Sequence, residues 1–155
     1  MRVRDLMRRE PRVTRPDASL AAAGRVMAEV DCGILPVVDD GRLVGVITDR
    51  DVCLAVARQE RAASQIEVRR AMSADLHTCG PEAAVSDALA TMREHRVRRL
   101  PVLGPDRALA GILSMDDVVL ATRPEGTPGF TGPAYGEVVE TLRAINEHLI
   151  PAGHA

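Results

Sequence analysis

The chain has 155 residues, with 20 basic and 22 acidic side chains and a formal net charge of −2 at pH 7. Every basic side chain is an arginine, because the sequence contains no lysine. This balance lacks the basic excess of nucleic-acid-binding domains, and residues 1–122 contain no Phe, Tyr or Trp ring on which a base could stack. No stretch reaches the roughly 18 uninterrupted apolar residues of a membrane span, and no apolar signal sequence follows the charged N-terminus. We therefore expect a soluble, cytoplasmic protein that binds neither nucleic acid nor membranes.

The three cysteines, Cys32, Cys53 and Cys79, are an odd number at wide spacings, which favours reduced thiols over a disulfide framework. His77 and Cys79 could supply two metal ligands from one short segment. A structural zinc site usually has four ligands in tighter pairs, so a strand end is the better interpretation of this segment. We expect no metal site and no catalytic cofactor, although the sequence leaves a metal at His77 and Cys79 open.

The sequence repeats itself along residues 1–122. A shift of 65 positions places Leu35-Pro36-Val37 on Leu100-Pro101-Val102, and a shift of 66 then places Asp51-Val52 on Asp117-Val118. A match of this length indicates two copies of one structural unit. We therefore predict a first repeat at 1–61, a second repeat at 62–122, and a Pro/Gly-rich linker with a C-terminal helix at 123–155.

The first repeat predicts a β-α-β-β-α unit. Apolar residues at helical spacing indicate the helices, and two β-branched runs around a glycine-containing turn indicate a hairpin in which Pro36 marks an edge or a bulge. The predicted elements are a short strand near Val13, a helix over 20–30, strands over 34–38 and 43–47, and a helix from its cap at Thr48 to about Arg58.

The second repeat predicts the same unit, with a helix over 85–92, strands over 100–103 and 108–113, and a helix capped by Ser114. Neither three-stranded unit would cover its own sheet well, which favours packing the two together. After the linker at 123–135, apolar residues from Val138 to Leu149 predict an amphipathic helix. A lone helix of this length is marginal in water, so we expect it to dock on its own module or on a partner.

A related motif follows each predicted hairpin. Residues 45–51 and 111–117 both consist of a glycine, two aliphatic residues, a hydroxyl residue, two variable residues and an aspartate. One interpretation is a helix start, in which the hydroxyl caps the helix and the acid interacts with the helix dipole. The other is a ribose site, in which the carboxylate accepts hydrogen bonds from both sugar hydroxyls and the glycine lets backbone approach the ligand. The motif by itself leaves both interpretations open.

With the Leu-Pro-Val strand, the hairpin and the Gly-x-x-[Ser/Thr]-x-x-Asp ending each present twice, residues 1–122 resemble a tandem pair of cystathionine-β-synthase (CBS) domains. The resemblance implies an α+β fold in which two repeats pack about a pseudo-twofold axis and bind an adenosyl ligand in the cleft between them. The implied ribose ligands are Thr48 and Asp51 for one site and Ser114 and Asp117 for a second. The residues implied to surround the bases are Thr14, Ile34, Leu35 and Pro36, and Cys79, Arg99, Leu100 and Pro101.

A phosphate group requires cations, and arginines occur just before the second Leu-Pro-Val strand. In similar pairs, basic residues at the positions of Arg98 and Arg99 reach the phosphates of the nucleotide whose ribose binds the other repeat. Arginine suits this role through its fixed fork of donors, although a solvated basic edge that discourages aggregation is the alternative. The first repeat departs from the pattern, because the matching positions are Gly33 and Ile34. We therefore expect only one site to bind phosphate.

The resemblance implies a stand-alone regulatory module that binds AMP, ADP, ATP or another adenosyl ligand, forms a homodimer and acts on an unidentified downstream protein. The alternative is a ligand-free structural dimerisation module whose motif residues are only caps. An enzyme is the weakest hypothesis, because the sequence has no nucleophile–base pair and no phosphate-binding loop, and 155 residues cannot contain the catalytic barrel of the dehydrogenases that carry such pairs. The physiological ligand is not identified by the sequence.

Overall fold

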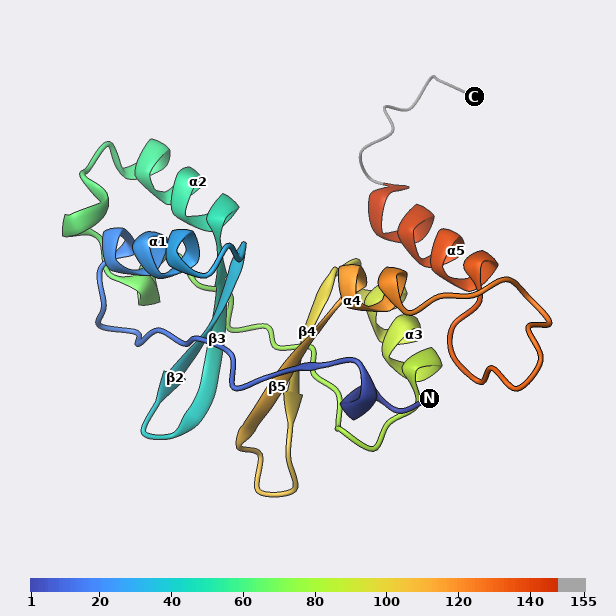
Figure 1. The fold of residues 1–155 in the computed structure, drawn as a ribbon. Helices are drawn as coiled ribbons and strands as arrows, with labels where there is room; N and C mark the ends of the chain where they lie inside the picture. The colour runs from blue at the N-terminus through green and yellow to red at the C-terminus, as the bar shows by residue number, and fades with distance from the viewer. Residues whose placement is uncertain (148–155) are drawn as a thin grey trace, which may run out of the picture. The chain divides into compact units, whose positions relative to one another are not determined.

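The computed structural model describes residues 1–147, and the chain divides into two compact units. We call residues 10–76 with 107–109 the first-repeat unit, and residues 1–9, 77–106 and 110 onward the second-repeat unit. Figure 1 draws the helices and strands of each unit. The elements combine helices and antiparallel strands, which confirms the predicted α+β class.

The first-repeat unit contains α1 (Leu20–Glu29), the hairpin of β2 (Ile34–Asp39) and β3 (Arg42–Thr48), and α2 (Asp49–Gln59), as the sequence predicted. Helix α1 begins at Ser19, whose hydroxyl accepts a hydrogen bond from the backbone N–H of Ala22 at 3.2 Å. The apolar stripe of α1 and the inward residues of the hairpin form one core. Its buried members are Leu20, Ala23, Met27, Leu35, Val37, Ile47, Ala55, Ile66 and Val68.

The second-repeat unit contains α3 (Val85–His95), β4 (Arg99–Leu103), β5 (Leu109–Ser114) and α4 (Met115–Leu120). A short strand, β1 (Arg8–Arg9), pairs with β5, so that the strand order is β1-β5-β4. The predicted helices and hairpin of the second repeat are confirmed, whereas its leading strand is only a single parallel bridge between Cys79 and Val102. The buried residues of this core are Val3, Val85, Ala88, Leu89, Met92, Leu100, Val102, Leu113, Met115, Val118, Val138 and Ile145.

The compact units differ from the sequence repeats, because each repeat's leading segment packs with the other repeat. The 3-10 turn η1 (Val3–Asp5) lies in the second-repeat unit, where the N–H of Val3 donates to the carbonyl of Ala83 at 3.0 Å. The turn η3 (Val68–Arg70) lies in the first-repeat unit, where the N–H of Val68 donates to the carbonyl of Ala18 at 2.8 Å. Val3 and Val68 are both 0% exposed, so each unit completes its core with a valine from the other repeat.

The strand expected near Val13 is a single parallel bridge between Thr14 and Val37. The N–H of Thr14 donates to the carbonyl of Pro36 at 3.0 Å, and the N–H of Val38 donates to the carbonyl of Thr14 at 2.9 Å. Strand β2 has its bulge between Val37 and Val38, one residue after the proline. Of the two predicted alternatives, an edge or a bulge, the structure has a bulge, which begins one residue beyond Pro36. The missing N–H of Pro36 would have faced the Thr14 segment.

The C-terminal helix α5 (Tyr135–Asn146) docks on its own module, which was one of the two expected outcomes. It packs against α3 and α4, and the guanidinium of Arg93 donates to the hydroxyl of Thr141 at 3.3 Å. Val138 and Ile145 join the second-repeat core, whereas Leu149 lies outside the described residues. Within residues 1–147 no helix has the length and apolar character needed to cross a membrane.

Candidate functional site

The motif of the first-repeat unit forms a complete capping box at the start of α2. The N–H of Asp51 donates to Thr48 Oγ1 at 3.2 Å, and Asp51 Oδ2 accepts from the N–H and the hydroxyl of Thr48 at 2.9 and 2.7 Å. The helix-start interpretation is therefore confirmed. These bonds hold the half-buried carboxylate in one orientation, and within the described chain no group donates to its second oxygen, Oδ1.

The second-repeat motif forms the same box at α4, with an additional partner. Asp117 Oδ2 accepts from the N–H and the hydroxyl of Ser114, while the N–H of Asp117 donates to Ser114 Oγ at 3.2 Å. Arg8 Nε lies 3.1 Å from the other oxygen, Asp117 Oδ1, and the Asp117 side chain is only 10% exposed. The two motif carboxylates therefore differ in how much hydrogen-bonding capacity remains.

The motif glycines allow close approach of the chain's own backbone, whereas the sequence had suggested approach of a ligand. A Cβ atom on Gly45 would lie 2.9 Å from the carbonyl oxygen of Ser73, and one on Gly111 would lie 2.7 Å from that of Arg8. Contacts this short are incompatible with a side chain. Each glycine thus permits the pairing that joins a repeat's hairpin to the leading segment of the other repeat.

The residues expected around the first base lie together. Thr14 is held beside β2 by its backbone hydrogen bonds to Pro36 and Val38. Thr14 and Ile34 are 8% and 9% exposed, and Leu35 is fully buried in the core. This unit therefore places its candidate base-binding residues at the start of β2 and on the segment beside it.

The second-repeat unit repeats this arrangement around Cys79. The N–H of Cys79 donates to the carbonyl of Pro101 at 3.2 Å, and the N–H of Leu103 donates to the carbonyl of Cys79 at 2.9 Å. Leu100 is 0% exposed and belongs to the core. Cys79 and Thr14 therefore occupy matching places in the two units.

Both candidate phosphate ligands have partners that the sequence did not suggest. The guanidinium of Arg98 donates to the side-chain carbonyl of Asn146 on α5. Arg99 Nη2 lies 3.9 Å from Asp116 Oδ2, and its side chain is 33% exposed. In the first-repeat unit, a Cβ atom on Gly33 would lie 3.0 Å from a carboxylate oxygen of Asp49. The position that matches Arg98 therefore has an acid beside it and no cation of its own.

His77 and His95 form a second polar feature of this unit. Their rings stack with centroids 3.7 Å apart and an angle of 9° between their planes. The nearby Cys79 is partly buried, and burial raises the pKa of its thiol to about 11. Within residues 1–147 no three His, Cys, Asp or Glu side chains are grouped so that they could hold a metal ion.

We predict that Cys79 reacts with iodoacetamide about 100-fold more slowly at pH 8 than a thiol of pKa 9.0 would, because the reactive thiolate forms only near its pKa of about 11. The labelling rate should rise with pH until that value. Mass spectrometry of labelled peptides measures the rate, and the exposed Cys53 is the internal control. Equal labelling of Cys79 and Cys53 at pH 8 would contradict the prediction.

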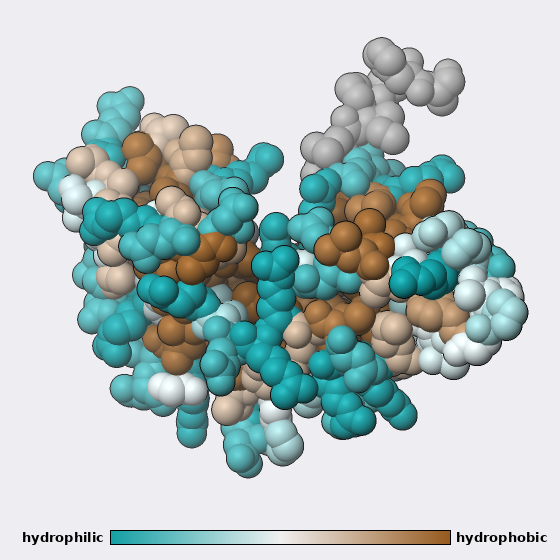
Figure 2. Space-filling view, in the orientation of Figure 1, coloured by the Kyte–Doolittle hydropathy of each residue, from teal (hydrophilic) through white to brown (hydrophobic). Residues whose placement is uncertain are grey.

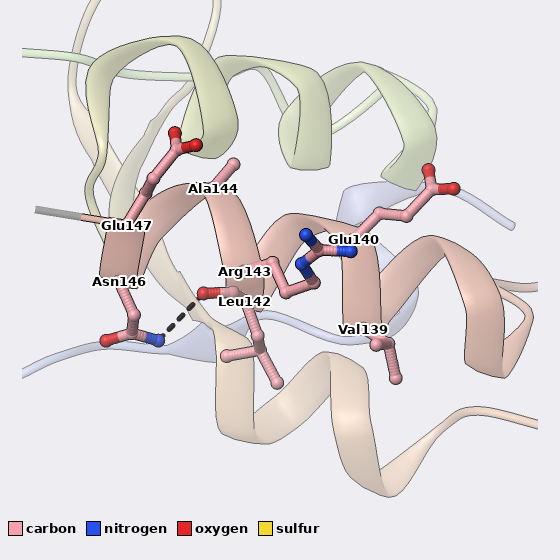
Figure 3. A pocket seen from close by; sticks show the side chains of 7 residues that line it. All are labelled: Val139, Glu140, Leu142, Arg143, Ala144, Asn146 and Glu147. Carbon is pink, nitrogen blue, oxygen red and sulfur yellow. Dashed lines mark hydrogen bonds between the residues drawn. The ribbon is translucent and has the colours of Figure 1, made fainter. Parts of the chain in front are cut away.

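A surface pocket of about 640 Å³ lies along α5, as Figure 3 shows. Its lining residues are Val139, Glu140, Leu142, Arg143, Ala144, Asn146 and Glu147. None of the motif residues lines it, and all of its lining residues belong to one helical stretch at the end of the described chain. We therefore place the candidate site at the capping boxes. One lining residue of the pocket, Asn146, accepts a hydrogen bond from the candidate phosphate ligand Arg98.

Comparison with known proteins gives one consistent match. The model of the CBS domain family matches residues 3–58 and 66–123. The chain is 32% identical over 118 residues to the CBS domain-containing protein YhcV of Bacillus subtilis, covering 76% of this chain and 83% of that protein. It is 34% identical over 119 residues to hypoxic response protein 1 of Mycobacterium tuberculosis, covering 74% and 80% of the two chains.

Solved structures give the same match. A crystal structure of Hypoxic Response Protein I, which contains two coordinated zinc ions, superposes with a TM-score of 0.71 at 29% identity and covers 80% of this chain and 100% of that one. The CBS domain pair of protein MJ0100, in complex with 5′-methylthioadenosine and S-adenosyl-L-methionine, superposes with a TM-score of 0.71 at 23% identity and covers 77% and 94%. Both similarities confirm the fold of a CBS domain pair.

Proposed function

Since this chain belongs to the CBS-domain family, with one CBS domain in each repeat, we propose that it is a regulatory module that binds an adenosine nucleotide (AMP, ADP or ATP) or a related adenosyl ligand. Regulation would arise because ligand binding favours one conformation or one partner over another. The MJ0100 pair contains two adenosyl compounds, which supports this class of ligand.

The observation that carries the proposal is the state of the Asp51 carboxylate. Thr48 holds one of its oxygens, and within residues 1–147 the other oxygen accepts no hydrogen bond. A carboxylate oxygen has two lone pairs, so Asp51 Oδ1 can accept hydrogen bonds from both hydroxyls of a ribose. Because the capping box already fixes the side chain, binding would cost little additional ordering.

We also propose that the protein has no catalytic activity of its own. Cys79 lies among the candidate base-binding residues. Burial raises the pKa of its thiol to about 11, so the thiol is protonated and weakly nucleophilic at neutral pH. The motif hydroxyls of Thr48 and Ser114 bond to carboxylates that also cap helices.

We place the protein in the cytoplasm. Its cysteines Cys32, Cys53 and Cys79 are unpaired, which fits that reducing compartment.

A ligand-free dimerisation module is the second candidate function, and two observations favour it. The capping boxes account for both motif acids without a ligand. In addition, Figure 2 shows hydrophobic surface over α4 and α5, where Val119, Leu120 and Val139 are 43%, 77% and 56% exposed. We propose that this apolar surface is covered in a homodimer, and dimerisation is compatible with either function.

Native mass spectrometry and thermal unfolding of the full chain separate the two functions. We expect a dimer that binds an added adenine nucleotide, with a higher unfolding midpoint because a ligand at 100 times its Kd adds about 2.7 kcal/mol to the stability of a binding protein. GTP and CTP are the controls for the base. A dimer whose midpoint is unchanged by AMP, ADP, ATP and S-adenosylmethionine would favour the structural module.

A further inference from the structure

Arg8 contacts the motif carboxylate of the second-repeat unit. Its backbone lies on β1, opposite Ile112 of β5, and its Nε atom lies 3.1 Å from Asp117 Oδ1. The Arg8 side chain is 71% exposed, whereas the Asp117 side chain is 10% exposed. The guanidinium therefore lies on the outer side of a carboxylate that is otherwise enclosed.

The first-repeat unit has serine in the corresponding place. Ser73 lies opposite Val46 of β3, just as Arg8 lies opposite Ile112 of β5, and both partners directly follow the motif glycine. The side chain of Ser73 is short and uncharged, and among residues 1–147 nothing bonds to Asp51 Oδ1. The two repeats thus differ at the position from which Arg8 reaches the motif acid of the second repeat.

The remaining acceptor capacity of the two acids follows from a count of lone pairs. An ionised carboxylate offers about four acceptor positions. Asp51 uses two of them for the N–H and the hydroxyl of Thr48, and both remaining positions lie on one oxygen. Asp117 uses two for Ser114 and a third for Arg8, so only one position remains. The two hydroxyls of a ribose diol donate two hydrogen bonds. The free oxygen of Asp51 can accept both of them, whereas Asp117 can accept only one.

We propose that Arg8 closes the ribose-binding carboxylate of the second repeat, so that the chain binds one adenosyl ligand per protomer, at Asp51. Arg8 acts as a specificity-determining residue that selects which repeat binds the sugar. The inference rests on the proposed function, because it assumes that the motif acids recognise ribose. A ligand at Asp117 would have to displace a charge-assisted hydrogen bond, which is the stronger kind, from a largely buried acid.

The test exchanges the two residues between the repeats. Adenosine is the probe, because it has no phosphate and so does not require a phosphate contact from Arg98 or Arg99. Isothermal titration calorimetry of the wild-type protein should give one site per chain, and Arg8→Ser should give two. Ser73→Arg should weaken the single wild-type site by at least about tenfold, since loss of one charged hydrogen bond corresponds to roughly that factor. In the Arg8→Ser background, Asp117→Ala should return the stoichiometry to one.

The other outcomes separate the role of Arg8 from the proposed function. Two sites in the wild-type protein, or one site in the Arg8→Ser variant, would show that Arg8 does not close Asp117, while the proposed function would stand. Two wild-type sites of which Arg8→Ser weakens one would make Arg8 a ligand-binding residue. No binding of adenosine by the wild-type protein or by Arg8→Ser would overturn the proposed function and the inference with it. Circular dichroism and thermal unfolding verify that each variant is folded.

Discussion

Replacement of Asp51 with alanine is expected to weaken the binding of an adenine nucleotide by at least about 100-fold, because hydrogen bonds to a charged group contribute roughly 1.5–3 kcal/mol each and a ribose would make two of them. The fold should persist, since loss of a helix cap costs about 0.5–2 kcal/mol. Calorimetric titration measures the affinity, and thermal unfolding measures the stability. A 2′-deoxynucleotide should lose part of the same binding energy in the wild-type protein.

Asp117→Ala is the matched control for this prediction. Both variants lose the same capping contacts, and Asp117→Ala also loses the bond to Arg8, so its stability should fall at least as much as that of Asp51→Ala. Only Asp51→Ala should lose affinity for the nucleotide, because Arg8 already bonds to Asp117 Oδ1 in the wild-type protein. If Asp51→Ala binds as tightly as the wild-type protein, the motif acids are only caps and the ribose interpretation is wrong.

Replacement of Arg99 with alanine is expected to weaken the binding of AMP, ADP or ATP by at least about tenfold, because a charged hydrogen bond to phosphate contributes roughly 1.5–3 kcal/mol. The affinity for adenosine should be almost unchanged. The resemblance to CBS pairs predicts that Arg99 serves the phosphate of the nucleotide whose ribose binds Asp51. Stability should change little, since the ion pair of Arg99 with Asp116 is long, at 3.9 Å, and the Asp116 side chain is 76% exposed. Paired titrations with nucleotide and nucleoside measure this preference.

Arg143→Ala is the control for Arg99, because it removes the same charge from an exposed position on α5. It should leave the preference for nucleotide over nucleoside unchanged. Two sites of equal affinity, both insensitive to Arg99→Ala, would contradict the prediction. That result would indicate a ligand recognised through its ribose and base alone.

Local sequence patterns were sufficient to predict most elements of this fold. The helical spacing of apolar residues, the β-branched runs and the hydroxyl residues at helix starts depend on neighbours a few residues away, and α1, β2, β3, α2 and their counterparts formed where these signals indicated. The capping boxes at Thr48 and Ser114 are equally local, because all of their bonds join residues three positions apart. The same motif could not decide whether it also binds ribose.

Some contacts at the site were decided only by tertiary structure. Arg8 and Asp117 are 109 positions apart, and Arg98 and Asn146 are 48 apart, so neither pair leaves a local pattern. The exchange of the leading segments follows from the burial of Val3 and Val68, which depends on the whole core. One signal was present in the sequence: the shift of 65 places Arg8 on Ser73, a charge difference between two otherwise matching segments. Its meaning required the strand pairing that brings each residue beside a motif glycine, because only that pairing places the guanidinium within reach of the carboxylate.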